Sequence, residues 1–417
     1  MSSLKRNVIS LFVLQGSNYI IPLITFPYLV RVLGPTGYGS LGIGLALIQY
    51  FSLFIDFGFN LSSTRKIAKN RDDIDFVSGV FWETIIAKSI LLILSIFAIF
   101  IVVHCSKGFY EIKGIVYALS LQLIGSVLLP TWFFQGIEKM SKVTISYILA
   151  RGCTVPLIFV FVISVDDAWK AALIQGGGAL LAGLISCILV FKTKMIIRTK
   201  VSLGSVIFSM RESFPLFIGA VAISLYTMST PFILGIVSTK EQVGYYVASD
   251  RIRQALLGVF LILGNAFYPR VNVLMKQSSI LAFAFLRKLL YIQGTITFIF
   301  SFILYLSAGL IASILLGNQY PDASFILKIM SPMVFLVTTS VILCNYILLP
   351  MGHNHLYAKI PIVTSVVHIC YSIPLCAYFG AEGGAIAILL TEIITLMILL
   401  AINFKKGYLK RIFLING

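Results

Sequence analysis

Charged residues are scarce in this chain, and their scarcity excludes a soluble fold. Only 11% of the 417 residues are Asp, Glu, Lys or Arg, whereas 59% are hydrophobic and the mean hydropathy is +0.99. Soluble domains carry roughly 25% charged residues, and the fraction of surface that one core can bury levels off with chain length. Lipid must therefore surround most of the chain, which is predicted to be a polytopic membrane protein.

The sequence also lacks the motifs that most enzymes use. It contains no P-loop, no dinucleotide-binding fingerprint and no zinc-protease motif. Its six cysteines form no CxxC pair and mostly lie in apolar runs, as small hydrophobic residues do. The four histidines are interpreted as surface or packed groups: His104, His353, His355 and His368. We therefore expect no catalytic residue, no metal site and no cofactor.

Long apolar runs recur along the chain and predict about twelve transmembrane helices. Each run can cross about 30 Å of hydrocarbon as a helix, and the runs are too long and continuous for the strands of a barrel. The expected spans are 8–33, 40–63, 77–103, 114–135, 143–165, 169–191, 213–236, 243–268, 288–315, 324–349, 358–379 and 381–403. The predicted fold class is an all-α integral membrane protein.

The net charge of +17 has a topological explanation. If the N-terminus is cytoplasmic, 22 of the 32 Lys and Arg fall in tails and connections on that side and five on the other. Cytoplasmic connections carry such an excess of basic residues, and anionic headgroups attract it. Both termini are therefore expected in the cytoplasm, and no nucleic-acid partner is needed to explain the charge.

A basic connection near the middle divides the chain into two expected halves. Residues 1–191 form the first six-helix lobe, 192–212 a cytoplasmic linker, 213–403 the second lobe and 404–417 a basic tail. The linker is either a tether or an amphipathic helix on the inner membrane surface.

A weak internal echo favours duplication of the two halves. Gln15 and Asn18 in the first span recur as Ser224 and Thr227 in the seventh, each pair preceding a proline. The turn GPTGYG at 34–39 has an expected counterpart at Gly244 and the tyrosine after it. Many transporters are built from such repeats and bind substrate between them, so two like-oriented lobes around a central cavity are predicted. Chance similarity is the alternative.

Several ionisable residues fall inside the expected spans, where they usually face a bundle interior or a wet cavity. They are Asp56, Glu83, Lys88, Arg151, Asp250, Arg251, Arg253, Lys328 and Glu392, and Arg31 ends the first span. Asp250 is expected to pair with a base on a neighbouring helix, and Glu83 and Lys88 to reach the inner boundary by snorkelling. The excess of bases suits an anionic substrate, since Arg matches phosphate oxygens well.

Longer stretches of the sequence resemble a known family. They are RVLGPTGYGSLGIGLALIQYFSLFIDFGFNLSSTRKIAKNRDD at 31–73, PFILGIVSTKEQVGYYVASDRI at 231–252, FYPRV at 267–271, LGNQYPDASFILKIMSPMVF at 316–335 and LLPMGHNH at 348–355. These stretches resemble the Wzx-type O-antigen translocases, the polysaccharide branch of the multidrug/oligosaccharidyl-lipid/polysaccharide exporter superfamily. The resemblance covers nearly the whole chain in the expected order.

The resemblance implies a function as well as a fold. It implies a V-shaped pair of six-helix lobes around a largely cationic cavity in the bacterial inner membrane. The implied cargo is undecaprenyl-pyrophosphate carrying one oligosaccharide repeat unit, moved from the cytoplasmic to the periplasmic leaflet by alternating access. Ion antiport is the expected coupling, and other O-antigen assembly proteins are expected partners. Arg31, Asp56, Arg65 and Lys66 carry over from the hairpin motif, and Arg251 by its position on the eighth helix.

Three other functions are weighed against this one. A multidrug or cation exporter of the same superfamily is the nearest alternative. A membrane glycan polymerase would need a large outer loop, whereas the longest expected outer connection, 104–113, has about ten residues. A channel would need a filter of carbonyl loops or charged rings. The candidate substrate-binding or cavity residues are Gln15, Asn18, Arg31, Asp56, Arg65, Lys66, Arg151, Ser224, Thr227, Arg251, Arg253, Lys328 and Glu392.

Overall fold

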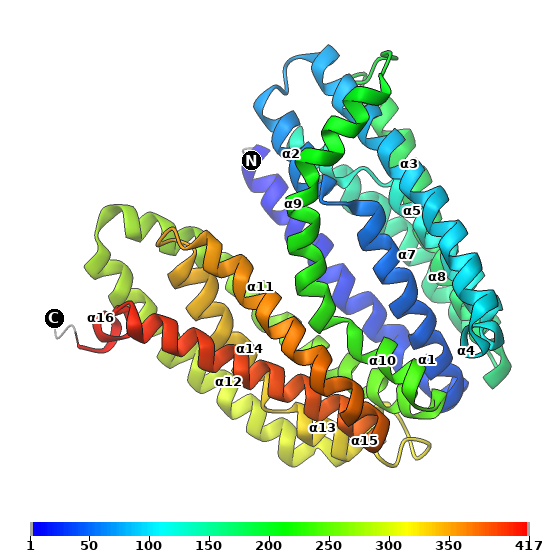
Figure 1. Cartoon of the computed structure of the whole chain (residues 1–417), viewed down its shortest axis with the longest axis vertical. Helices are drawn as coiled ribbons and strands as arrows, with labels where there is room; N and C mark the ends of the chain where they lie inside the picture. The colour runs from blue at the N-terminus through cyan, green and yellow to red at the C-terminus, as the bar shows by residue number, and fades with distance from the viewer. Residues whose placement is uncertain (1–2, 415–417) are drawn as a thin grey trace. The chain divides into compact units, whose positions relative to one another are not determined.

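All regular secondary structure in the described part of the chain is helical (Figure 1). The computed structural model describes the backbone of residues 3–414 and the side chains of residues 23–261, 267–268, 270–275, 277–353, 355–357 and 359–413. The chain divides into two compact units, Met1–Val221 and Ala222–Gly417. This all-helical architecture confirms the predicted class. Helices suit a lipid environment because they satisfy their backbone hydrogen bonds internally.

The first unit is a bundle in which small residues allow helices to approach closely. Its elements are α1 (Ser3–Asp56), α2 (Phe59–Lys69), α3 (Ile74–Cys105), α4 (Lys107–Glu111), α5 (Lys113–Leu128), α6 (Thr131–Gly136), α7 (Ser141–Phe161), η1 (Val165–Asp167), α8 (Ala168–Phe191) and the start of α9 (Leu203–Thr227). A Cβ on Gly125 would lie 2.5 Å from the Ala179 carbonyl oxygen, and one on Gly176 would lie 2.4 Å from that of Ala118. Such small residues are typical of packed membrane helices.

The second unit is built around one long interrupted helix. Its elements after α9 are α10 (Ser229–Val237), α11 (Lys240–Gln277), α12 (Ser279–Leu315), α13 (Ala323–Met330), α14 (Met333–Val341), the π-helix η2 (Ile342–Leu348), α15 (Asn354–Lys405) and α16 (Tyr408–Leu414). Gly380 interrupts α15 with φ 54° and ψ −130°. The Gln242 side-chain oxygen accepts from the Ala381 backbone N–H at 2.8 Å, so α11 satisfies a donor that the break leaves free.

The GPTGYG stretch is a break between two helices, as the sequence predicts. Within α1, Gly34 alone leaves the helical region, with φ 62° and ψ 178°, and Pro35 follows in the first turn, where a missing N–H costs nothing. The expected counterpart at Gly244 is misplaced: it lies inside α11, and the chain reverses earlier, between Val237 and Lys240.

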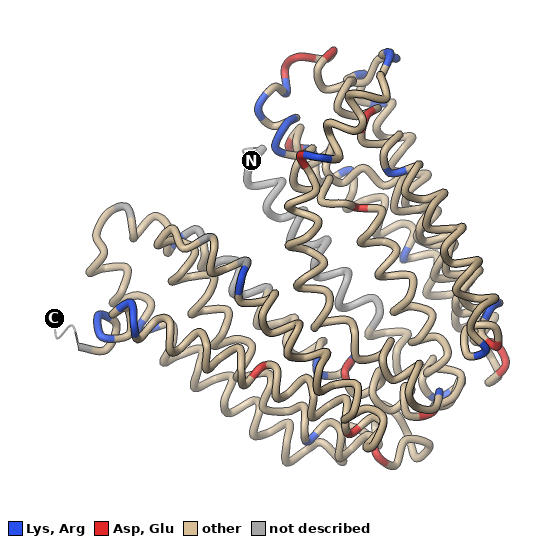
Figure 2. The backbone as a smooth tube through the Cα atoms, in the orientation of Figure 1, with Lys and Arg blue, Asp and Glu red and all other residues tan. Residues whose placement is uncertain are grey.

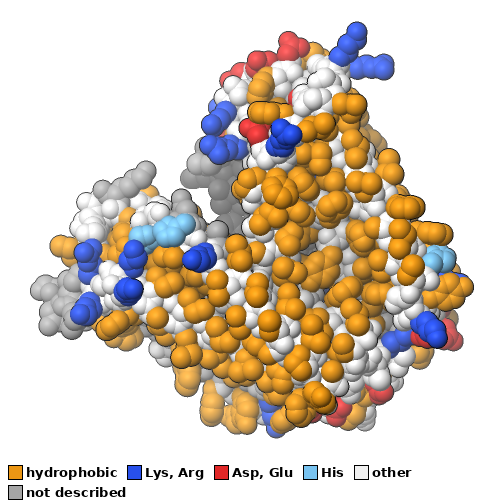
Figure 3. Space-filling view, viewed as in Figure 1, with side chains coloured by type: hydrophobic (Ala, Val, Ile, Leu, Met, Phe, Trp, Pro, Cys, Tyr) orange, Lys and Arg blue, Asp and Glu red, His pale blue; other side chains and the backbone are white. Residues whose placement is uncertain are grey.

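Nine helices among the described residues are long and apolar enough to cross a membrane. Large apolar side chains cover much of the visible surface in Figure 3, and the outward face of α3 alone exposes Ile93, Phe97 and Phe100 by 54% to 68%. Figure 2 shows that the Lys and Arg of the first unit lie mostly near helix ends. Multiple apolar helices make this a multi-pass membrane protein, while the count of twelve and the side of the termini stay predictions.

The basic connection between the halves is shorter than expected. The helix predicted to start at 213 begins at Leu203 and contains Pro215 in its interior. The residues before α9 run along α3: the Ile197 N–H donates to the Ser78 hydroxyl at 2.9 Å, and the Trp82 indole donates to the Ile197 carbonyl at 3.0 Å. This part of the connection is therefore anchored to α3 by its backbone.

Candidate functional site

The sequence DFGF at 56–59 interrupts the helix between α1 and α2, and the residues at this break pack against α9. Phe57 and Gly58 both have positive φ, 46° and 80°. The Phe57 ring stacks on Phe217 with centroids 4.6 Å apart and planes at 15°. A Cβ on Gly58 would lie 2.8 Å from the Ser213 carbonyl oxygen and 2.9 Å from Leu216 Cβ. The glycine is therefore required twice, for its backbone conformation and for the close approach of α9.

Gly58→Ala is expected to lower the free energy of unfolding by about 2–4 kcal/mol, because it combines left-handed strain with overpacking. The measurement is thermal unfolding of the detergent-purified protein, followed by size-exclusion recovery. Gly79→Ala is the matched control, since Gly79 lies in a helix and a Cβ there meets nothing within 4 Å. Equal stability of the two variants would show that α9 does not constrain the break.

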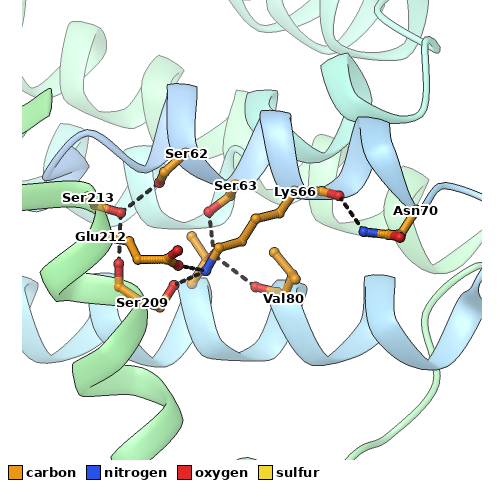
Figure 4. Close-up of polar contacts among 9 residues, drawn as sticks. Ser62, Ser63, Lys66, Asn70, Val80, Ser209, Glu212 and Ser213 are labelled. Carbon is orange, nitrogen blue, oxygen red and sulfur yellow. Dashed lines mark hydrogen bonds and ion pairs between the residues drawn. The ribbon is translucent and has the colours of Figure 1, made fainter.

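A polar cluster joins α2 to α9 next to this break (Figure 4). We call it the α2–α9 cluster, and it consists of Ser62, Lys66, Ser209, Glu212 and Ser213. The Lys66 ammonium forms an ion pair with Glu212 and lies 3.5 Å from the Ser209 hydroxyl. The Ser62 and Ser213 hydroxyls are 2.6 Å apart. The cluster thus holds one candidate cation, Lys66, against one carboxylate.

The ion pair of the α2–α9 cluster is partly exposed, and a second carboxylate outside the cluster lies nearby. The Lys66 side chain is 23% exposed and that of Glu212 43% exposed. Glu83 of α3 lies close enough to Lys66 and Glu212 for charge interactions with both. Exposed ion pairs of this kind contribute little to stability, so the Lys66–Glu212 pair is held only weakly.

A buried ion pair lies at the end of α1. The Lys88 ammonium is 3.1 Å from an Asp56 carboxylate oxygen, and the two side chains are 3% and 26% exposed. The expectation that Lys88 snorkels to the boundary is therefore wrong. Lys88 instead stays inside the bundle, where a charge is costly unless it is paired.

The second unit holds its own buried charges. Asp250 and Arg253 pair on the same helix, with contacts of 2.8 Å to Nε and 2.6 Å to a terminal guanidinium nitrogen, and the Gln254 amide donates to Asp250 at 2.6 Å. The expected partner on a neighbouring helix is thus wrong, because the i,i+3 spacing lets one helix supply both ions. Glu392 of α15 is 8% exposed and interacts with Arg253 through its charge.

The remaining candidate residues are dispersed. Arg31, Arg65 and Thr227 are exposed, Arg251 is half-buried and Ser224 is buried. The Arg151 guanidinium lies 5.7 Å from the centroid of the Tyr147 ring, and the Lys328 ammonium lies 6.0 Å from that of Tyr305. The side chains of Gln15 and Asn18 lie outside the described residues.

One histidine outside the spanning segments is held by a hydroxyl. His353 Nε2 lies 2.8 Å from the Tyr408 hydroxyl. Burial lowers the pKa of His353, and the nearby charges of Lys406 and His355 lower it further. Among the described residues, no group of three or more His, Cys, Asp or Glu side chains could hold a metal ion.

Glu212 and the two serines of α9 are the site residues that sequence reasoning missed. Ser209 and Glu212 fall in the stretch interpreted as linker, of which Glu212 is the one acidic residue, and Ser213 is the first residue of the expected seventh span. One acidic residue among the five Lys and Arg of 192–212 is the sequence signal that could have predicted an ion pair of Glu212. The partner of Lys88 was missed for another reason: Asp56 and Lys88 are 32 positions apart, and their meeting depends on how α1 and α3 are rotated.

Comparison with known proteins gives consistent relatives. The family model described as "Polysaccharide biosynthesis protein" matches residues 4–275. A protein of Escherichia coli (strain K12) named "Putative O-antigen transporter" is 35% identical over 97% of this chain and 98% of its own length. A protein of the same name from Shigella dysenteriae is 31% identical over 95% of this chain and 99% of its own length.

Solved structures with low sequence identity share the fold. An inward-facing multidrug resistance MATE family transporter of the MOP superfamily has a TM-score of 0.73 at 12% identity, covering 94% of this chain and 96% of that one. The lipid II flippase MurJ in an inward closed conformation has a TM-score of 0.69 at 15% identity, covering 97% of this chain and 89% of that one.

Proposed function

This chain belongs to the polysaccharide biosynthesis protein family, and from that premise we propose that it flips undecaprenyl-pyrophosphate-linked O-antigen repeat units from the cytoplasmic to the periplasmic leaflet of a bacterial inner membrane. The observation that carries the proposal is the full-length similarity to proteins named as O-antigen transporters. The fold shared with a lipid II flippase supports transport of a lipid-linked glycan. The chain is a transporter and not an enzyme.

The α2–α9 cluster supports the choice of an anionic headgroup. A pyrophosphate offers several strong acceptor oxygens, and charge-assisted hydrogen bonds to Lys are about twice as strong as neutral ones. Lys66 is held by a half-exposed carboxylate, and the neighbouring Ser209 hydroxyl is a further polar group beside it. In our proposal the pyrophosphate replaces Glu212 as the partner of Lys66, and exposed Arg65 adds a second positive charge at the same turn of α2.

The topology we propose has twelve spans with both termini in the cytoplasm. The two long spanning candidates, Leu23–Lys69 and His355–Lys405, are each interrupted by a glycine outside the helical region, at Gly34 and Gly380. Dividing them at these breaks and adding α11, which is long but less apolar, gives twelve. The lobes proposed are 1–191 and 213–403, around a cavity that opens alternately to either side, with ion antiport as the source of energy.

Complementation tests the proposed function. The gene is expressed in a strain that lacks its own O-antigen flippase and carries the glycan cluster matched to this protein. Restored O-antigen on the cell surface is the expected result. Absence of surface O-antigen at normal protein levels, with lipid-linked repeat units still accumulating in the cells, would overturn the proposal.

The fold shared with a multidrug transporter leaves export of drugs or dyes as the alternative function. An exporter of drugs or dyes would raise resistance to cationic dyes in a strain that lacks its major efflux pumps. We expect no such resistance, because in the proposed site the Lys66 ammonium would repel a cationic dye. Dye resistance without restored O-antigen would favour the exporter.

A further inference from the structure

Three connections of the second half carry basic residues without any acidic ones. The stretches 269–288, 350–359 and 404–417 contain four, one and four Lys or Arg, and no Asp or Glu. The corresponding connections of the first half mix their bases with five acids, Asp72, Asp73, Asp75, Glu138 and Glu212. Orientation in a membrane depends on Lys and Arg and hardly on acids, so it does not explain this difference. An anionic partner of the second unit would explain it.

A shared apolar core brings these three connections together. Its buried members include Phe283 of α12, Leu348 of η2, Ile360 of α15 and Ile412 of α16. The Phe283 ring also stacks on the Tyr408 ring of α16, with centroids 6.2 Å apart. Figure 3 shows Lys and Arg side chains gathered beside histidines at this end of the second unit, next to hydrophobic side chains. The basic connections therefore surround one core.

The last helix, α16, has an apolar face and a basic face. Tyr408, Leu409 and Ile412 pack on this core. Lys410 and Arg411 lie on the other face and are exposed. A helix with one apolar face and a basic opposite face is typical of segments that lie along an anionic membrane surface. In α16 the core already covers the apolar face, so the basic face is the one that is left for a partner.

Exposed aromatic rings lie beside the exposed bases. The Tyr291 ring of α12 lies 6.0 Å from the Phe413 ring of α16, and these side chains are 59% and 47% exposed. Lys288 and Lys410 each lie three residues before one of these rings, are exposed, and share a helix face with it. The Lys410 ammonium also lies 5.7 Å from the centroid of the Phe404 ring. We call these residues the α12–α16 patch: Lys288, Tyr291, Phe404, Lys410 and Phe413.

The order of bases and rings favours a lipid over an acidic protein segment. α12 is a spanning candidate that begins at Ser279, so Lys288 lies nearer than Tyr291 to the end of the helix where the basic connections are. A phospholipid has the same order, with its phosphate at the water boundary and its acyl chains deeper. Aromatic side chains collect at this level of a membrane. The topology proposed above places this end in the cytoplasm, and the cytoplasmic leaflet carries anionic lipids.

We propose that the α12–α16 patch binds an anionic phospholipid of the bilayer. The lipid phosphate lies at Lys288 and Lys410, and an acyl chain lies along Tyr291 and Phe413. The bound lipid holds α16 at the membrane surface. The patch shares no residue with the α2–α9 cluster, and its ligand is a lipid of the bilayer rather than the transported cargo.

Native mass spectrometry of the full-length protein in detergent tests the patch without any transport. Phosphatidylglycerol and phosphatidylcholine with the same acyl chains are titrated in separate experiments. We expect the wild type to bind phosphatidylglycerol the more tightly, and Lys288→Gln/Lys410→Gln to weaken that binding about tenfold or more, since each lysine near an anionic lipid contributes roughly fivefold. Lys288→Arg/Lys410→Arg keeps both charges and is expected to keep most of the binding.

Lys192→Gln/Lys200→Gln is the matched control, because it removes two exposed lysines from a connection of the first unit. Equal affinity of the wild type for both lipids, or an equal loss in the two glutamine variants, would overturn the proposal. Poly-L-glutamate and inorganic phosphate are then added at the concentration of the lipid, and neither is expected to displace phosphatidylglycerol. Displacement by poly-L-glutamate would assign the patch to an acidic protein, and displacement by phosphate would show that the acyl chain plays no part. Either displacement contradicts the proposal.

Discussion

Asp56→Asn is expected to lower the free energy of unfolding by about 3 kcal/mol, because it leaves a buried ammonium without its counter-charge. Lys88 is 3% exposed and its nitrogen lies 3.1 Å from the Asp56 carboxylate. Lys88→Met is expected to cost less, about 1 kcal/mol, since the 26% exposed Asp56 can be hydrated when it is left alone. The measurement is thermal unfolding in detergent together with the amount of protein in the membrane.

The double variant Asp56→Asn/Lys88→Met distinguishes a structural role from a functional one. Replacing both ions of a buried pair is often neutral for stability, so we expect the protein level to recover. If O-antigen display recovers together with the protein level, the ion pair is structural and Asp56 does not bind substrate. If the level recovers without display, Asp56 acts in transport. An Asp56→Asn protein as stable as the wild type would contradict the assigned ion pair.

Lys66→Ala is expected to reduce O-antigen display about tenfold or more, since a charge-assisted hydrogen bond contributes about 1.5–3 kcal/mol and 1.4 kcal/mol is a factor of ten. Its effect on stability is expected to stay within about 1 kcal/mol, because the pair with Glu212 is partly exposed. Lys66→Arg is expected to retain part of the display, since the charge remains and the geometry changes. Display is measured on intact cells at matched protein levels.

Lys69→Ala is the matched control, because Lys69 lies on the same helix, carries the same charge and is exposed. It removes one positive charge near the α2–α9 cluster without touching the pair with Glu212. An equal loss of display from the two alanine variants would show that only the overall charge of α2 matters. Loss of display from Lys66→Ala alone would locate the function at this side chain.

The helical runs could be predicted from sequence because their signals are local. A run of apolar residues identifies a span by itself, and the breaks at Gly34 and Gly380 coincide with the expected ends of spans. The break at Phe57 was not predicted: it lies in the expected span 40–63, and a phenylalanine with positive φ has no local signal. There the packing of α9 on Gly58 imposes the conformation.

The candidate site was less predictable because its contacts are not local. Lys66 was selected from the hairpin motif, but its partner Glu212 lies in a stretch expected to be a linker. Asp250 and Arg253 were both selected, and only the structure pairs them with each other. His368 is buried, which agrees with its interpretation as a packed histidine, but its hydroxyl partners Thr391 and Thr230 lie far from it in the sequence and could not be predicted. Residue type and spacing thus identified charged groups, and the three-dimensional fold selected their partners.

The most direct measurement is transport of the glycolipid by the purified protein. Proteoliposomes are loaded with undecaprenyl-pyrophosphate-linked repeat units extracted from a strain with the matched glycan cluster, and external glycan is removed enzymatically before the experiment. A lectin then reports the glycan that appears outside with time. We predict that the wild-type protein makes glycan appear outside much faster than Lys66→Ala does. Equal rates with wild-type, Lys66→Ala and heat-inactivated protein would contradict the central claim that this chain is a flippase for lipid-linked glycans.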